Sequence, residues 1–371
     1  MKRLSFLLLT SLLFAACGKD KQKNVYEVDT SAKAPIEEFI NREVACIELE
    51  TTTESMIGNI QSIEYDKDNI YIKPSYNAES ILRFDRHTGK FINSIGRKGR
   101  GPNEYTHFLD FTIGDGKAYV LSSKKIYVYD IDGKFQQTID TANEHFYNLT
   151  LCDDGKIWLA SNTCNESLYE YHLLNPKTGE IEAKMCEFPE YAGLLISGTS
   201  PFIRKKGNDY FVARCWDQTI YRLSADSCEP YLTIDFHRPN SVTAEQRISL
   251  TPAIIDELME KNDYFYYFAG IVQNNRKIIT VADINYRHEN KCSCMVKIDK
   301  ASSEIKYTQL TFTESEKLPY LKNCWFGYAG RIVDNMIVGF ANALDINQTE
   351  RFKHLKDDDN PVLFFYELNM D

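Results

Sequence analysis

The segment from Phe91 to Tyr105 reads FINSIGRKGRGPNEY, and its residue types are suited to binding an anion. It places three glycines beside the cations Arg97, Lys98 and Arg100, and glycine-rich loops of this kind can cradle phosphate with their backbone amides. A phosphate cradle, however, leads into the N-terminus of a helix, where free amides and the helix dipole meet the anion. The residues that follow here, THFLDFTIG, have the pattern of a strand, so the sequence does not predict a nucleotide site.

The glycines of this segment are better explained as turn residues. Gly96, Gly99 and Gly101 permit backbone angles that other residues avoid, and Pro102 stiffens the return of the chain. We expect the carboxylate of Glu104 to bond amides of the loop. A structural turn is therefore the main prediction, and contact of the three cations with an anionic ligand is a second role that the sequence leaves open.

The cysteines and histidines do not form a recognisable metal or catalytic signature. The chain has ten cysteines, and those other than Cys17 are an odd, scattered set that does not indicate a disulfide framework. Cys292 and Cys294, with His288 nearby, lack the second ligand pair of a zinc site, so free thiols are expected there. The seven histidines are also scattered, and no nucleophile elbow is visible. The sequence therefore predicts no catalytic residue.

The first residues of the chain predict export. Lys2 and Arg3 precede an apolar run from Leu4 to Phe14 that is too short for a stable membrane anchor. We therefore predict a signal peptide at residues 1–16. No later run of about 18 residues is apolar throughout, so the rest of the chain is expected to lie outside the bilayer.

The end of the signal peptide resembles a bacterial lipobox. The run is Ala15, Ala16 and Cys17. In a lipobox the thiol of the cysteine is lipidated, so Cys17 would become the first residue of the mature protein. Phe14 stands where a lipobox usually has leucine, so an ordinary signal peptide is the alternative. We predict that residues 17–43 form a lipid-anchored tether and linker, and that the protein is held in the cell envelope, at the outer membrane.

Charge and composition limit the partners and the fold class. The formal net charge is −10, and removal of two cations, Lys2 and Arg3, with the signal peptide takes it to −12. Such an acidic chain is not expected to bind nucleic acid. The chain has 23 Tyr and 21 Phe, and this abundance of aromatic residues favours strands over helices.

One pattern of strands recurs six times along the chain. Paired strands such as NIYIKPS with SILRFDRHTGKFINSI enclose turns in which glycine supplies the positive φ of a hairpin. A further strand precedes each pair, so the repeat has four antiparallel strands, which is typical of propeller blades. We predict an all-β, six-bladed β-propeller over residues 44–371, with an open solenoid or two sandwiches as the alternative. The middle strands begin near residues 81, 126, 168, 220, 294 and 362.

The two ends of the chain are expected to close the ring. The sixth repeat stops after VLFFYEL and lacks its fourth strand, whereas the strand ACIELET at residues 45–51 has no partner of its own. Pairing of this N-terminal strand with residues 362–368 would complete the sixth blade. It would also remove the edges that an open array leaves exposed.

Nearly all the extra length of the repeats falls on one face of the predicted propeller, at residues 96–106, 186–197, 236–268, 311–326 and 343–361. The turns of the opposite face are short. Long loops on one rim of a rigid scaffold usually carry the binding site. The third of these loops includes TPAIIDELMEK, which predicts a short helix that serves either as a lid or as a cover for blade edges.

The candidate ligand-binding residues follow from this placement. They comprise loop cations, tryptophans on the loop-rich face and arginines on innermost strands that can line the channel. Exposed aromatic rings often recognise sugars or peptides, and packing between blades is the alternative explanation for the tryptophans. The predicted set is Arg97, Lys98, Arg100, Trp216, Trp325, Arg204 and Arg331.

The run G-R-K-G-x-G-P-x-E-Y after a propeller hairpin, on a chain that begins with a lipobox, resembles the six-bladed β-propeller lipoproteins of gut Bacteroidetes. The resemblance covers essentially the whole mature chain. It implies the same fold and the same cellular compartment. That family has no general assigned reaction, so the resemblance transfers no catalytic residue.

The sequence favours a non-enzymatic function. We predict a binding or scaffold lipoprotein without a cofactor that engages a glycan, a peptide or an envelope protein through its loop-rich face. The alternative is a hydrolase similar to the six-bladed, calcium-dependent lactonases, in which Asp110 and Asn148 on innermost strands would offer oxygens to Ca²⁺ in the channel. That alternative needs a further acid from another inner strand, and the sequence does not identify one.

Overall fold

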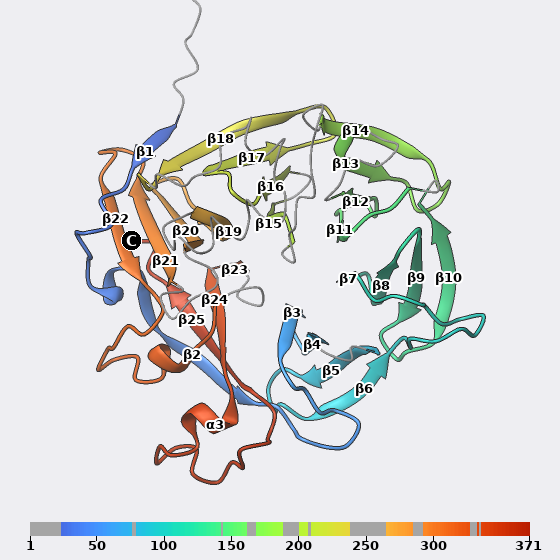
Figure 1. The fold of residues 1–371 in the computed structure, drawn as a ribbon, viewed down its shortest axis with the longest axis horizontal. Helices are drawn as coiled ribbons and strands as arrows, with labels where there is room; N and C mark the ends of the chain where they lie inside the picture. Colours follow the sequence, from blue (N-terminus) through green and yellow to red (C-terminus); the bar gives the residue numbers. More distant parts are fainter. Residues whose placement is uncertain are drawn as a thin grey trace, which may run out of the picture.

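The computed structural model describes most of the chain after residue 23. Within the described residues, six β-sheets stand around a central axis like the blades of a propeller (Figure 1). The predicted all-β, six-bladed β-propeller is confirmed. The described ranges are 24–75, 79–141, 144–161, 168–187, 200–206, 209–237, 265–284, 292–326, 332–333 and 335–371.

Blades 1, 2 and 3 are built from consecutive stretches of chain, and each runs from an innermost to an outermost strand (Figure 1). Blade 1 contains β3 (Ile60–Tyr65), β4 (Asn69–Pro74), β5 (Ile81–Asp85) and β6 (Phe91–Ile95). Blade 2 contains β7 (Asp110–Gly114), β8 (Lys117–Ser122), β9 (Lys125–Asp130) and β10 (Phe135–Asp140). Blade 3 contains β11 (Asn148–Leu151), β12 (Ile157–Ala160), β13 (Tyr169–Leu174) and β14 (Ile181–Glu187).

In blades 4 and 6 a strand from the N-terminal region pairs with the sheet, and in blade 5 this region forms a single bridge. Blade 4 contains β15 (Phe202–Lys206), β16 (Asp209–Ala213), β17 (Thr219–Leu223) and β18 (Cys228–Asp235), followed by β1 (Val25–Glu27). Blade 5 contains β19 (Phe265–Gln273), β20 (Lys277–Ile284), β21 (Cys292–Asp299) and β22 (Ile305–Gln309). Blade 6 contains β23 (Ile332–Val333), β24 (Met336–Ala341), β25 (Val362–Leu368) and β2 (Ile40–Glu48).

Strand β2 closes the ring as predicted. It pairs antiparallel with β25, with Glu48 opposite Val362 and Ala45 opposite Phe365. The paired strand extends from Ile40 to Glu48, whereas the sequence pattern placed it at residues 45–51. The pattern missed its first half because Asn41, Arg42 and Glu43 are polar, and the shift in register between Ile40 and Arg42 and again between Glu43 and Ala45 interrupts the alternation of side chains.

Residues 24–39, which we call the N-terminal strap, bind the outside of blades 4 and 5 before β2 begins. Strand β1 runs parallel to β18, with Val25 opposite Thr233. Further along, Lys33 forms a parallel bridge with Tyr307 of β22. The 3₁₀ helix η1 (Ile36–Glu38) then leads into β2. The sequence analysis placed a tether and linker over this part of the chain and identified none of these contacts.

Position within a blade determines how each strand is buried. Strand β4 is buried along its whole length, and so is nearly all of β25, because neighbouring blades cover both of their faces. In contrast, most residues of the outermost strands β6, β10 and β14 are exposed or partly exposed. Side chains of alternating strand positions fill the space between blades, which is where β-branched and aromatic residues pack best.

Helical structure is confined to short segments in the described loops. Besides η1, these are η2 (Leu321–Asn323) and α3 (Ala343–Ile346), and the predicted helix in TPAIIDELMEK lies outside the described residues. Across the same described residues, no helix has both the length and the apolar character that a membrane crossing requires.

One disulfide bond joins adjacent blades. Cys186 of β14 in blade 3 is bonded to Cys228 of β18 in blade 4. Cysteine spacing alone did not reveal this pair, since 42 positions separate the two residues and the link depends on the packing of the outermost strands. Among the described cysteine side chains, Cys46 and Cys324 are free thiols.

Candidate functional site

The segment between blades 1 and 2 is a tightly bonded turn, as predicted. The Tyr105 side chain is fully buried, and its hydroxyl donates to the carbonyl of Glu79 at 2.7 Å. The backbone amide of Lys98 donates to the same carbonyl at 2.8 Å. The amide of Gly99 donates to the carbonyl of Tyr105 at 2.9 Å, so the segment folds back on itself.

Glu104 organises this turn from within. Its carboxylate accepts the amide of Gly101 at 2.8 Å, which confirms the predicted bond to a loop amide. A Cβ atom at Gly99 would lie 1.9 Å from Oε2 of Glu104, so only glycine allows the carboxylate this position. Gly96 has a φ of +73°, a backbone angle that glycine adopts without strain. The glycines therefore serve the geometry of the turn.

The three cations of the turn lie on its outer surface. The side chains of Arg97, Lys98 and Arg100 are exposed. Arg97 lies 3.6 Å from a carboxylate oxygen of Glu104, a loose contact at the surface. The turn thus holds its backbone rigid and presents positive charge to the solvent, which is compatible with the second role that the sequence left open.

A buried polar cluster lies where the same crossover enters the channel, and we call it the channel cluster. It consists of Lys73 from β4, Asp110 at the start of β7 and Asn148 at the start of β11, so blades 1, 2 and 3 each contribute one residue. Nδ2 of Asn148 donates to Oδ2 of Asp110 at 3.1 Å, and the amide of Leu149 donates to the same oxygen at 3.2 Å. Lys73 donates to the carbonyl of Leu109, next to Asp110.

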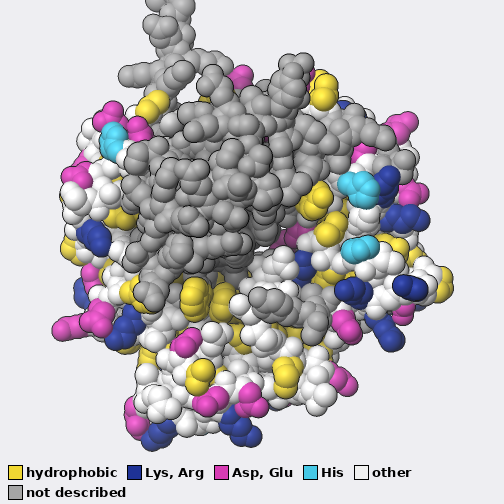
Figure 2. Space-filling view, in the orientation of Figure 1, with side chains coloured by type: hydrophobic (Ala, Val, Ile, Leu, Met, Phe, Trp, Pro, Cys, Tyr) yellow, Lys and Arg dark blue, Asp and Glu magenta, His cyan; other side chains and the backbone are white. Residues whose placement is uncertain are grey.

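The channel cluster has bonding capacity that the described residues do not satisfy. Asn148 is 8% exposed, and its Oδ1 atom is buried without a hydrogen-bond partner. The ammonium of Lys73 has three N–H groups but donates to one carbonyl and lies 4.8 Å from the centre of the Phe108 ring. Figure 2 shows acidic and basic side chains beside the hollow at the centre of the ring.

Burial makes Lys73 an unusual lysine. Its side chain is 3% exposed, and burial lowers its pKa to about 8, although the nearby Asp110 carboxylate acts in the opposite direction. A buried charged group with a strongly shifted pKa is typical of functional sites, because burial of the charge costs free energy.

The channel cluster contains both residues of the predicted calcium site. The structure brings Asp110 and Asn148 together, as that alternative requires. The third nearby side chain, however, is the ammonium of Lys73, whose charge would repel Ca²⁺. In the part of the chain that the structure describes, no three or more His, Cys, Asp or Glu side chains gather in a way that could hold a metal ion. These residues therefore do not fit a calcium centre.

The other predicted binding residues lie in different surroundings. Trp216 is 2% exposed and packs edge-on against Tyr266, so its ring contributes to the core and offers no exposed platform. Trp325 is exposed, as a binding platform requires. Arg204 lies on the innermost strand β15, although its side chain is outside the described part, and Arg331 is outside the described residues altogether.

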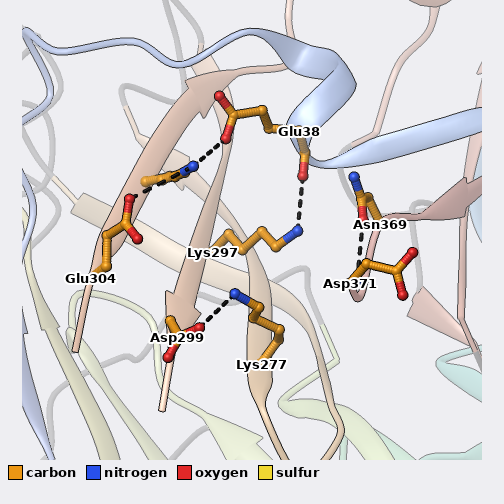
Figure 3. A pocket seen from close by; sticks show the side chains of 8 residues that line it. Glu38, Lys277, Lys297, Asp299, Glu304, Asn369 and Asp371 are labelled. Atoms are coloured by element: carbon orange, nitrogen blue, oxygen red, sulfur yellow. Dashed lines mark hydrogen bonds and ion pairs between the residues drawn. The ribbon is translucent and has the colours of Figure 1, made fainter. Parts of the chain in front are cut away.

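A second polar site lies at the short-turn end of blade 5, and we call it the blade 5 cleft (Figure 3). Its volume is about 220 Å³. Blade 5 supplies most of the wall, the strap supplies one residue and the chain after β25 supplies the last two. The lining residues are Glu38, Lys277, Lys297, Asp299, Glu304, Lys306, Asn369 and Asp371.

Two of the three lysines in the blade 5 cleft are neutralised. Lys277 donates to Asp299 at 2.6 Å, and this bond is the main reason that the pKa of Asp299 is lowered. Lys306 pairs with Glu38 at 2.5 Å, and the bond raises the pKa of Lys306. Lys297, directly opposite Lys306 in the ladder, is the exception.

Sequence analysis missed Lys73 and the blade 5 cleft. A signal for Lys73 was present, because a lysine interrupts the apolar strand NIYIKP and β4 proved to be buried throughout. The blade 5 cleft had no comparable signal, since Glu38 and Lys297 are far apart in the chain and meet only where the strap passes blade 5.

The chain is similar to several known proteins. The model of the domain of unknown function DUF4934 matches residues 24–367. A "putative exported protein" from Bacteroides fragilis has a similar crystal structure, with a TM-score of 0.67 and 18% sequence identity over 93% of this chain and 99% of that chain. Among curated proteins, none matches.

Two further solved structures are more distant. The WD40 domain of Pan2 from Neurospora crassa has a TM-score of 0.44 and 10% identity, over 86% of this chain and 82% of that chain. A protein of unknown function from Bacteroides caccae has a TM-score of 0.42 and 12% identity, over 72% of this chain and 84% of that chain. At these identities, the similarity to the Bacteroides fragilis protein supports the fold alone.

Proposed function

The chain belongs to the family defined by the domain of unknown function DUF4934, and from this premise we propose that it is an exported binding protein that recognises a glycan at the loop-rich end of its channel. The channel cluster is the observation that carries this proposal. Buried polar groups are normally satisfied by hydrogen bonds, so an amide oxygen without a partner and an ammonium with spare N–H groups indicate a missing polar group.

A sugar hydroxyl suits this cluster because it both donates and accepts. It would donate to Oδ1 of Asn148 and accept from the ammonium of Lys73, which a purely anionic or purely cationic group would not do. The exposed cations Arg97, Lys98 and Arg100 lie on the crossover that leads into the cluster, and they would favour glycans that carry carboxylate or sulfate groups. In a chain with a net charge of −10, such local positive charge stands out.

The proposed location is the cell envelope, with lipid attached to Cys17. The lipobox-like run before Cys17 supports attachment, and the similarity to the "putative exported protein" from Bacteroides fragilis supports export. The Cys186–Cys228 disulfide is a third argument, because disulfides persist outside the reducing cytoplasm. Replacement of Cys17 by Ser should release the protein from membranes, since the acyl chains would supply the anchoring.

Screening the mature chain on an array of neutral and acidic glycans tests the binding proposal. For any glycan that binds, we expect the Asn148→Leu variant and the Arg97→Ala/Arg100→Ala double variant each to lose about tenfold or more in affinity, as removal of a hydrogen bond to a charged or buried group predicts. Arg276→Ala, an exposed cation at the opposite end of the ring, is the matched control. The proposal fails if no glycan binds, or if these variants bind like the parent.

A further inference from the structure

Lys297 is a buried cation without a neutralising partner. Its side chain is 8% exposed, and its ammonium donates to the backbone carbonyl of Glu38 at 3.1 Å. Among the described residues, no carboxylate lies within ion-pair distance of it, whereas its neighbours Lys277 and Lys306 each have one. Burial of a charge without a counter-ion is costly, so a buried and unneutralised ammonium that lines a cleft indicates a place for an anionic group.

The two neighbouring lysines strengthen this argument. Burial lowers the pKa of Lys297, and the like charges of Lys277 and Lys306 lower it further, whereas the carboxylates of Glu38 and Asp371 have a smaller, opposite effect. Lys297 and Lys306 face each other across the β21–β22 ladder, and like charges in that position repel. A carboxylate bound between them would relieve this repulsion and restore the charged form of Lys297.

The rim of the blade 5 cleft carries negative charge, in contrast to the lysines inside it. Glu304 is 61% exposed and lies 3.6 Å from Lys306, whose closer bond is to Glu38. Asp371 is exposed as well and has no ion pair among the described residues. A simple anion would have to pass these carboxylates, which repel it, whereas a ligand that also carries an ammonium would be attracted by them.

We propose that the blade 5 cleft binds a free α-amino acid, with its carboxylate on Lys297 and its ammonium at the carboxylates of Glu304 and Asp371. The volume of about 220 Å³ corresponds to several water molecules at about 30 Å³ each, which is enough for a small amino acid. The site lies at the short-turn end of the ring, away from the channel cluster, and it does not depend on glycan binding.

Isothermal titration calorimetry with glycine, L-alanine, L-glutamate and L-lysine tests this assignment, with acetate and methylamine as probes that carry one charge each. We expect at least one amino acid to bind more tightly than either single-charge probe. Lys297→Met should weaken that amino acid about tenfold or more, because it removes the ion pair at the base of the cleft. Lys125→Met, which replaces an exposed lysine of blade 2, should leave the affinity unchanged.

Glu304→Gln provides a second variant at an exposed position where folding is not at risk. It should weaken the amino acid but not acetate, since it removes an acceptor for the ammonium alone. The proposal is overturned if no amino acid binds, if acetate binds as tightly as the best amino acid, or if a folded Lys297→Met variant and the Glu304→Gln variant both bind like the parent.

Discussion

Blades 4, 5 and 6 differ from blades 1, 2 and 3 in what covers their outer edges. Strand β1 covers β18, the strap bridges to β22 and β2 covers β25, so residues from one N-terminal stretch bind three successive blades. In blades 1, 2 and 3 the outermost strands β6, β10 and β14 end their sheets within the described residues (Figure 1).

The two halves of the ring, blades 1–3 and blades 4–6, are therefore stabilised by different kinds of contact. The first half relies on contacts between residues close in the chain, such as the hydrogen bond from the amide of Gly101 to Glu104 in the turn between blades 1 and 2. The second half relies on pairings between residues that are hundreds of positions apart, such as Glu48 with Val362. Closure of a long loop costs conformational entropy, so these distant contacts must be individually strong, and the strap meets that need with buried apolar side chains. The disulfide between Cys186 and Cys228 joins the halves at blades 3 and 4.

Deletion of the strap, residues 24–39, should have the largest effect. Val28, Ile36 and Phe39 are all buried, and burial of such side chains is worth about 1.5–3 kcal/mol each, so the free energy of unfolding should fall by roughly 5 kcal/mol. Urea denaturation of the two proteins measures the difference. Deletion of residues 17–23 is the control and should change little; equal loss in both deletions would contradict a special role for the strap.

Removal of the disulfide should have the next largest effect. Cys186→Ser should lower the free energy of unfolding by about 2–4 kcal/mol, because the bond restrains the unfolded chain between blades 3 and 4. Denaturation with and without a reductant checks this, and the variant should no longer respond to the reductant. Cys46→Ser, which removes a free thiol, is the control. If the parent protein is as stable with the reductant as without it, the disulfide does not stabilise the contact between blades 3 and 4.

A change at Gly99 tests how much the bonded turn between blades 1 and 2 stabilises the first half. Gly99→Ala should cost about 1–3 kcal/mol, because the new Cβ would meet the Glu104 carboxylate at 1.9 Å and displace it from Gly101. Thermal melting of this variant should be compared with that of Gly58→Ala, where no atom lies within 4 Å of the added Cβ. If both variants melt alike, the bonded turn does not stabilise this half.

The smallest expected effect concerns Lys73 and its dependence on pH. The folded pKa of about 8 lies below the ordinary value of 10.5, so between these values the unfolded chain binds more protons and stability rises with pH. Below pH 8 both states carry the proton, and the cost of a buried charge remains. Urea denaturation at pH 7.5 and 9.5 should show a gain for the parent that is smaller in Lys73→Met; an equal gain would mean that Lys73 is not the source.

Much of the fold was predictable because strand and turn patterns are local. The alternation in KAYVLSS and KIYVYDIDGKFQQTI, together with a glycine at the turn, specifies a hairpin without reference to the rest of the chain. Six such repeats and one unpaired strand then implied a closed ring. The role of Glu104 was predictable for the same reason, since its partner Gly101 is three residues away.

The candidate sites were less accessible to sequence analysis. A cysteine directly precedes both Trp216 and Trp325, yet packing between blades buries the first, whereas the second is exposed. A side chain's exposure depends on which blade lies against it, and the sequence of one strand does not contain that information.

The sequence by itself determined the repeat and the position of each hairpin, because these depend on residues within one or two turns of chain. Only the tertiary structure decided the path of the strap, the disulfide and the burial of Lys73 and Lys297. Lys73 and Asn148 both lie near Asp110 only because three blades stand side by side, and Lys297 meets Glu38 only where the strap crosses blade 5. These contacts follow from the packing of complete blades, for which no local pattern in the sequence provides a signal.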